Sequence, residues 1–200
     1  MAGFLYGVKR ALFRFSPRWA ARLGVAFVLD TPGRAFLETG IFDYINRRAQ
    51  PGARCLLVGV DRHNWHYARL LRPELHTLDG MPARAVYGVP GRHRVGSVLR
   101  MARYYAPHAF DFVIIDRVLG QGVNSPEEAA HMLRQACEVM KPGGVLVLGY
   151  QDTPRRAPVP VELGEGFEAV VPAIDGVNAP WHRVDDACPH VYLFARKRHV

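Results

Sequence analysis

The segment from Phe110 to Tyr150 constrains the fold of this 200-residue chain more than any other part of the sequence. Phe110–Ile115 is a short aromatic and β-branched run that ends on Asp116, which is the pattern of a buried parallel strand. Ser125 is the expected N-cap of a helix whose apolar residues recur at helical spacing, and Val145–Leu148 is a second buried strand. Strand, helix and strand predict a right-handed βαβ unit.

Other short apolar runs predict further strands of the same sheet. These runs are Arg54–Gly59, Leu75–Leu78, His93–Val95, Phe167–Val171 and Val191–Ala195. A helix is predicted from Asn64 to Leu71, ahead of Pro73. Because sites in parallel sheets lie beyond the carboxyl ends of the strands, Asp116–Val123 and Tyr150–Arg156 are expected to border a cleft.

Composition indicates a single globular α/β protein with a basic surface. Hydrophobic residues make up 49% and charged residues 22%, and the net charge is +8. Such a charge favours anionic partners, but the chain is rich in Arg, Ala, Gly, Val and Pro throughout, as in proteins of GC-rich bacteria. Basic residues do not interleave with aromatic ones, so nucleic-acid binding is not predicted. The three cysteines are widely spaced and odd in number, which indicates free thiols in a reducing cytoplasm: Cys55, Cys137 and Cys188.

The N-terminal region differs from the rest in its charge pattern. No acidic residue precedes Asp30, and the cations before it are Lys9, Arg10, Arg14, Arg18 and Arg22. The apolar residues lie roughly on one helical face: Phe4, Leu5, Val8, Leu12, Phe13 and Phe15. No apolar run approaches the ~20 residues of a membrane span. We expect a helical cap over residues 1–50 on a sheet domain over residues 51–200, with membrane-surface binding as the alternative.

Two motifs resemble the class I S-adenosylmethionine (SAM) dependent methyltransferases. Phe110–Leu119 is similar to the family's fourth strand and the loop that follows it, and Met140–Leu148, with its Lys-Pro-Gly-Gly turn, to the entry into the fifth strand. The resemblance extends more thinly from Arg54 to Arg198. It implies a Rossmann-like, seven-stranded and mostly parallel sheet with an antiparallel last strand.

The resemblance also implies a SAM site, of which the first half is degenerate. The family has an acidic residue late in the first strand and then Gly-x-Gly; this chain has Leu57 at the acidic position, Gly59 as the first glycine and Asp61 as the second. A non-glycine residue at positive φ costs about 1–2 kcal/mol. Arg62 is expected to pair with Asp61 and fill the space of the methionine end.

The second half of the implied SAM site keeps more of the pattern. Asp79, at the end of the second strand, matches the acid that accepts hydrogen bonds from the ribose hydroxyls, although Asp-Gly is also a generic turn signal. Ser97 stands where the family has an Asp that contacts the adenine amino group. The cofactor-binding set is therefore Gly59, Asp61, Asp79 and Ser97.

Candidate catalytic residues are Asp116 and His66, each as a proton acceptor; pairing of Asp116 with Arg117 or another nearby Arg is the structural alternative. Polar or aromatic residues in the loops beside the expected cleft are candidate substrate contacts: Gln121, Tyr150, Arg155 and Trp181. Asp61, His63 and His66 lie close in sequence, but their spacing fits no closed metal site, so no metal is predicted.

Three functions follow as hypotheses. The first is a cytoplasmic methyltransferase-like enzyme that acts on a small molecule in a bacterial biosynthetic pathway with an atypical SAM site. The second is an enzyme of the same fold that works without SAM, by elimination or cyclisation with a carboxylate base. The third is a non-catalytic subunit that docks on a protein partner through its N-terminal helix, and homo-oligomerisation is a further form of such association.

Overall fold

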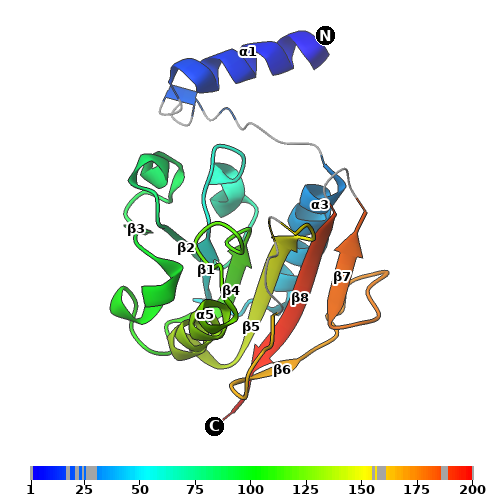
Figure 1. Ribbon diagram of the computed structural model, residues 1–200. Coiled ribbons are helices and arrows are strands. Elements are labelled where there is room, and N and C mark those ends of the chain that lie inside the picture. Colours follow the sequence, from blue (N-terminus) through cyan, green and yellow to red (C-terminus); the bar gives the residue numbers. More distant parts are fainter. Residues whose placement is uncertain are drawn as a thin grey trace.

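A computed structural model describes residues 2–16, 19–20, 23, 25, 31–154, 156, 161–185 and 189–199. Arg18, Arg22, Arg155 and Cys188 lie outside the described residues. The centre is an eight-stranded sheet in the order β3-β2-β1-β4-β5-β8-β6, with β7 also paired to β8 (Figure 1). The strands are β1 (Arg54–Val58), β2 (Glu74–Asp79), β3 (His93–Val95), β4 (Phe110–Asp116), β5 (Met140–Gln151), β6 (Phe167–Ala169), β7 (Trp181–Val184) and β8 (His190–Lys197).

The first five strands are parallel, and β8 runs antiparallel to β5, as the resemblance implied. The predicted strands and the βαβ unit are confirmed. β7 was not predicted, and it makes the sheet one strand larger than expected. β6 and β7 share one edge of β8, where β6 pairs with Ala195–Lys197 and β7 with His190–Leu193.

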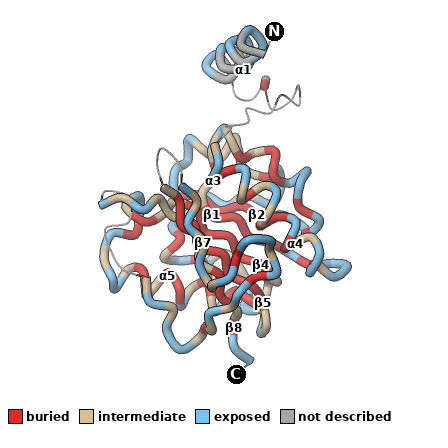
Figure 2. The backbone as a smooth tube through the Cα atoms, turned by 90° about the vertical axis from the view of Figure 1, so that its right-hand side faces the viewer, coloured by how far each residue is buried: buried red, intermediate tan, exposed pale blue. Residues whose placement is uncertain are grey.

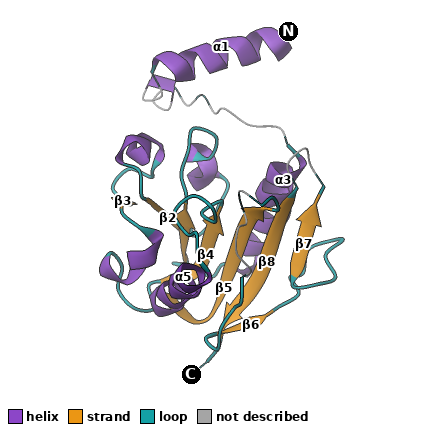
Figure 3. Ribbon diagram, viewed as in Figure 1, coloured by secondary structure: helices purple, strands orange, loops and turns teal. Residues whose placement is uncertain are grey.

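Helices are unevenly distributed around the sheet (Figure 3). The helical segments are α1 (Ala2–Phe15), α3 (Pro32–Ala35), the π-helical turn η1 (Phe36–Ile41), α4 (Phe42–Arg48), α5 (Pro126–Val139) and the short 3-10 helices η2 (Trp65–Arg69), η3 (Pro82–Tyr87) and η4 (Val98–Arg103). Of the connections between the parallel strands, only β4 to β5 contains a full α-helix. It is capped as predicted, because Ser125 Oγ accepts from Glu128 N at 3.2 Å.

The helix predicted over Asn64–Leu71 is wrong in type, because this segment forms only the 3-10 turn η2. Asn64 explains the difference. Its side-chain oxygen accepts from Asp61 N at 2.7 Å, and its amide donates to Gly59 O at 2.9 Å. Such side-chain bonds to nearby backbone compete with helix formation, and they hold the chain as a compact loop at the end of β1.

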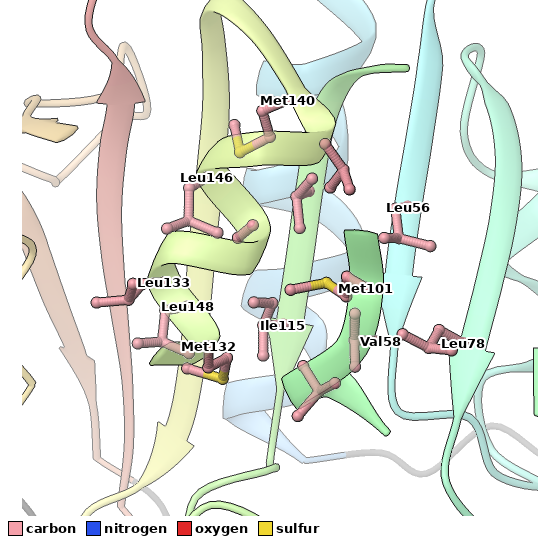
Figure 4. Packing of buried hydrophobic residues seen from close by; sticks show 14 of the residues in the cluster. Leu56, Val58, Leu78, Met101, Ile115, Met132, Leu133, Met140, Leu146 and Leu148 are labelled. Carbon is pink, nitrogen blue, oxygen red and sulfur yellow. The ribbon is translucent and has the colours of Figure 1, made fainter. Parts of the chain in front are cut away.

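Two apolar clusters cover the two faces of the sheet, and buried residues follow the strands through the molecule (Figure 2). On one face α5 and η4 pack through Met132 and Met101 onto Leu56, Ile115 and Leu146 (Figure 4). The other face is covered by the continuous helix from Pro32 to Arg48. The strands that carry the expected site are therefore packed on both faces by apolar side chains.

The N-terminal helix α1 lies apart from the sheet, beyond the end of the molecule to which the parallel strands point (Figure 1). Below it, the buried Ala20 packs with Leu12, Val25, Trp65 and Tyr87. Among the described residues no helix is both long and apolar enough to cross a membrane. The division into a cap over residues 1–50 and a sheet domain stays a prediction.

Candidate functional site

A cleft of about 420 Å³ opens at the carboxyl ends of β1, β2 and β4. Six of the residues predicted for the site line it: Gly59, Asp61, Asp79, Ser97, Asp116 and Gln121. The topology explains this convergence, since parallel neighbouring strands end at the same edge of the sheet. Four charged or polar lining residues were not named individually, namely Arg84, Arg117, Gln151 and Arg156, although the last three lie in the two segments that were expected to border the cleft.

Asp79 anchors one half of the cleft. Its carboxylate is 5% exposed and accepts from Val60 N at 3.0 Å and from Met81 N at 2.7 Å. Arg84 Nη1 lies 3.4 Å from the same carboxylate. Because a carboxylate has about four acceptor positions, Asp79 keeps some capacity for hydroxyl groups of a ligand.

The walls beside Asp79 are apolar with one hydroxyl. Met81 follows β2, and Val98 follows β3, and both line the cleft. Ser97 Oγ accepts from Leu99 N at 3.2 Å and caps η4, which leaves its O–H free to donate. This surface suits a planar group joined to a diol. The carboxylate can accept from the diol, the two apolar side chains can contact the planar faces, and the hydroxyl can donate to a polar edge.

Gly59 occupies the tight turn after β1. Its φ is +91°, and a Cβ atom there would lie 2.8 Å from the carbonyl oxygen of Asp116. A side chain at this position would collide with the β4 backbone, so the turn requires glycine for conformation and for space. The predicted role of Gly59 as a close-approach position fits this geometry.

The other half of the cleft is filled by a chain of charged groups. Asp61 Oδ2 lies 3.9 Å from Arg34 Nη2 and 3.1 Å from Arg117 Nη2. Arg117 Nε donates to Asp116 Oδ2 at 3.0 Å, and His190 Nε2 donates to Asp116 Oδ1 at 3.0 Å. These five residues are named the ionic chain here, and they link the helix before β1 to β4 and β8.

The ionic chain corrects two expectations. The strained backbone expected at Asp61 lies instead at Arg117, because Arg117 (φ 57°) and His108 (φ 57°) are the two non-glycine residues with positive φ among those described. The expected partner of Asp61 was Arg62, but Arg117 and Arg34 hold its carboxylate, and Arg62 Nε donates to His63 Nε2 at 3.1 Å.

Asp116 is a fixed anion in this arrangement. Burial raises its pKa, but Arg117 and His190 outweigh burial and lower the pKa to about 2. Both of its oxygens are engaged. The desolvated general base suggested by the sequence needs a raised pKa, so this geometry favours the structural alternative of pairing with an Arg.

Gly149 on β5 makes room for the pair of Asp116 and His190. A Cβ atom at Gly149 would lie 2.6 Å from Asp116 Oδ1, 2.9 Å from Tyr192 Cε1 and 3.0 Å from His190 Nε2. We expect Gly149→Ala to lower the free energy of unfolding by about 1–3 kcal/mol, since all three neighbours are packed in place. Urea melts check this, with Gly80→Ala as a control, because a Cβ atom at Gly80 would meet only Gly96 O at 3.7 Å and neither glycine has a positive φ. Equal losses in both variants would refute the steric argument.

His66 lies outside the cleft lining. It is buried with Nε2 3.9 Å from Glu38 Oε1, and its Nδ1 has no hydrogen-bond partner. Burial, with the nearby Arg34 and Arg69, lowers its pKa to about 4. His66 would have to leave this packing to reach a group in the cleft, so the structure does not bring it together with Asp116 as a catalytic pair.

Two of the remaining substrate candidates, Tyr150 and Trp181, do not line the cleft. Tyr150 is half-buried and packs against the α5 side of the core. Trp181 is 56% exposed on β7, and Arg155 is outside the described residues. The described residues contain no cluster of His, Cys, Asp and Glu that could hold a metal ion.

Sequence reasoning missed the extent of the ionic chain. The sequence indicates Arg117 only as a partner of Asp116, and it indicates no role for Arg34. Arg34 is buried and donates to Tyr67 Oη at 2.8 Å and to His63 O at 3.0 Å. A lone Arg in a segment of helical pattern gives no signal of such a role, because its partners are distant in sequence.

Neither the family models nor the curated proteins include a match to this sequence. Solved structures do match the fold. The N-methyltransferase NodS from Bradyrhizobium japonicum WM9 has a TM-score of 0.61 at 17% identity over 85% of this chain and 99% of that chain. A SAM-dependent methyltransferase from Methanosarcina mazei has a TM-score of 0.54 at 12% identity over 78% and 97%. The cyclase SpnF has a TM-score of 0.54 at 16% identity over 80% and 81%.

These likenesses agree with the strand order, the antiparallel β8 and the cleft at the ends of β1, β2 and β4. The chain therefore has the Rossmann-like fold of the class I SAM-dependent methyltransferases.

Proposed function

We propose that the cleft binds the adenine nucleoside part of SAM, and that the chain is a methyltransferase-type enzyme acting on a small molecule of bacterial biosynthesis. The observation that carries this proposal is the buried Asp79 carboxylate in a cleft walled by Met81 and Val98. In this arrangement Asp79 would accept from the ribose hydroxyls, Ser97 would donate to the adenine edge, and the two apolar side chains would contact the adenine faces. NodS, which shares the fold, has been solved in complex with S-adenosylhomocysteine (SAH).

The residues present fit the two ends of SAM unequally. The nucleoside end meets matching groups at Asp79 and Ser97. The amino-acid end would meet the pair of Asp61 and Arg117, whose atoms are 3.1 Å apart and fill the turn after β1. A ligand carboxylate would have to replace Asp61 as the partner of Arg117. We therefore expect SAM to bind weakly compared with its binding to a site that has Gly-x-Gly at this turn.

SAM would supply an electrophilic methyl group when bound. The contribution of this chain would be mainly orientation and exclusion of water. Gln121 and Gln151 line the cleft and offer amide groups to position a polar acceptor. Asp116 would keep Arg117 in place rather than accept a proton, because its pKa is lowered to about 2. A weakly acidic acceptor would accordingly need to lose its proton to solvent.

A second function has an observation in its favour. The ionic chain occupies the amino-acid end of the cleft, which suits an enzyme that uses this fold without SAM. SpnF is a cyclase with this fold. Calorimetric titration with SAM, SAH and adenosine separates the two functions, because a micromolar dissociation constant for SAH supports the methyltransferase hypothesis. An absence of binding at millimolar ligand supports the second.

Asp79 is expected to be the main ligand contact. Asp79→Ala should weaken SAH binding about 10- to 100-fold, the usual scale of a hydrogen bond to a charged group. Thermal melting first establishes that the variant is folded, since Val60 N and Met81 N lose their acceptor. Met81→Asp is a second variant, because Met81 is 51% exposed and its change leaves the backbone bonds intact. Unchanged SAH affinity in both folded variants would count against nucleoside binding in this cleft.

A further inference from the structure

The helix α1 exposes an apolar stripe that the other described residues leave open to solvent. Phe4 is 77% exposed, Leu5 57%, Val8 49% and Phe15 86%. At 100° per residue these four side chains fall within one third of the helix circumference, and Leu12 falls within the same third. Exposed apolar side chains that gather on one face mark a surface for binding rather than random exposure.

The charges around this stripe have one sign. Lys9 and Arg14 are exposed, and they fall on opposite flanks of the stripe by helical spacing. The first 29 residues contain five cations and no acidic residue. A helix with an apolar stripe flanked by cations complements a surface that is apolar inside and anionic outside.

We propose that α1 binds the surface of an anionic lipid bilayer and makes this protein a peripheral membrane protein. Its 14 residues span about 21 Å, which is shorter than the ~30 Å hydrocarbon core, so the helix lies in the interface and does not cross it. The apolar stripe enters the boundary of the acyl chains, and the cations contact the lipid phosphates.

The position of α1 sets the side of the molecule that faces the bilayer. Ala20 packs with Trp65 and Tyr87, which follow β1 and β2 at their carboxyl ends. The cleft opens at these same strand ends, toward the end of the molecule where α1 lies (Figure 1). A bilayer bound by α1 therefore lies on the side of the cleft.

Flotation of the full chain with vesicles tests this inference and needs no SAM, so it is independent of the proposed function. We expect vesicles of phosphatidylcholine with 30% phosphatidylserine (about one third anionic lipid) to retain the protein at least about 10-fold better than phosphatidylcholine alone. Val8→Asp should abolish retention. Lys9→Glu with Arg14→Glu should lower it about 25-fold or more, because each cation near such a surface contributes about a factor of five.

Matched variants on the body of the protein control for overall charge and polarity. Val171→Asp changes a residue that is 56% exposed, and Arg72→Glu with Arg103→Glu gives the same change in charge as the α1 variant. These controls should float like the wild type. Equal retention on neutral and anionic vesicles, no retention on either, or equal losses in controls and α1 variants would each overturn the inference. So would a dimer in lipid-free solution that Val8→Asp converts to a monomer, since a second copy would then cover the stripe.

Discussion

Replacing Asp116 by alanine is expected to lower the free energy of unfolding by about 3–5 kcal/mol, the scale of breaking a buried ion pair by removing one partner. Asp116 is buried, and its two oxygens accept from Arg117 and His190. Without it, Asp61 is the one close anionic partner that the described part of the chain offers to Arg117. His190, itself buried, loses its acceptor.

The pH dependence of the same variant gives a second, more specific readout. The pKa of Asp116 is lowered from its ordinary 3.8 to about 2 in the folded protein. A carboxylate with a lowered folded pKa stabilises the protein above its unfolded pKa, and this contribution is lost as pH falls through the folded pKa. The difference between wild type and Asp116→Ala should therefore be largest at neutral pH and shrink between pH 3.8 and about pH 2.

Asp152→Ala is the matched control. Asp152 also follows a strand end and pairs with an Arg, Arg183, but both side chains are nearly half exposed. We expect a loss below about 1 kcal/mol, as for other surface ion pairs. A similar loss in Asp116→Ala and Asp152→Ala, or a difference from wild type that does not change with pH, would show that the ionic chain does not stabilise the fold.

The sequence predicted the sheet well because its signals are local. Phe112–Ile115 and Val145–Leu148 are continuous apolar runs, which suit a strand that is covered on both faces. β7 was missed for the opposite reason. Its four residues are exposed or half-buried and lie at the edge of β8, so no apolar run marks them.

The positions of the candidate residues could be predicted where strand order determines them, but the ion-pair partners of these residues could not. Gly59, Asp79, Ser97 and Asp116 sit at strand ends, and strand order brings such positions together. The partner of Asp61 could not be read from spacing, because Arg117 is 56 residues away in the chain and Arg34 precedes the sheet entirely. A partly buried charge pairs with the group that the fold places beside it, which for Asp61 is not its sequence neighbour Arg62.

Removing the charge of Asp61 is expected to raise the affinity for SAH about 10-fold or more. Asn keeps the acceptor Oδ1 that binds His63 N at 2.6 Å, so the turn after β1 should retain its shape. Arg117 and Arg34 would then lack their shared carboxylate, and Arg117, which lines the cleft, would present its guanidinium group to the amino-acid end of a ligand. Hydrogen bonds between Arg and a carboxylate are among the strongest in proteins, so a ligand carboxylate would form the hydrogen bonds with Arg117 that Asp61 forms in the unmodified protein.

Adenosine distinguishes this effect from a general change in the cleft, because it has the nucleoside but no carboxylate. Calorimetry of Asp61→Asn should show stronger binding of SAH and unchanged binding of adenosine, with Asp152→Asn as a control for the loss of one surface carboxylate. If Asp61 instead contacts the ammonium group of the ligand, the sign of the change in affinity would be reversed. Weaker SAH binding in Asp61→Asn would therefore mean that Asp61 holds the ligand rather than competes with it, and the ionic chain would then be part of a working amino-acid site instead of its replacement.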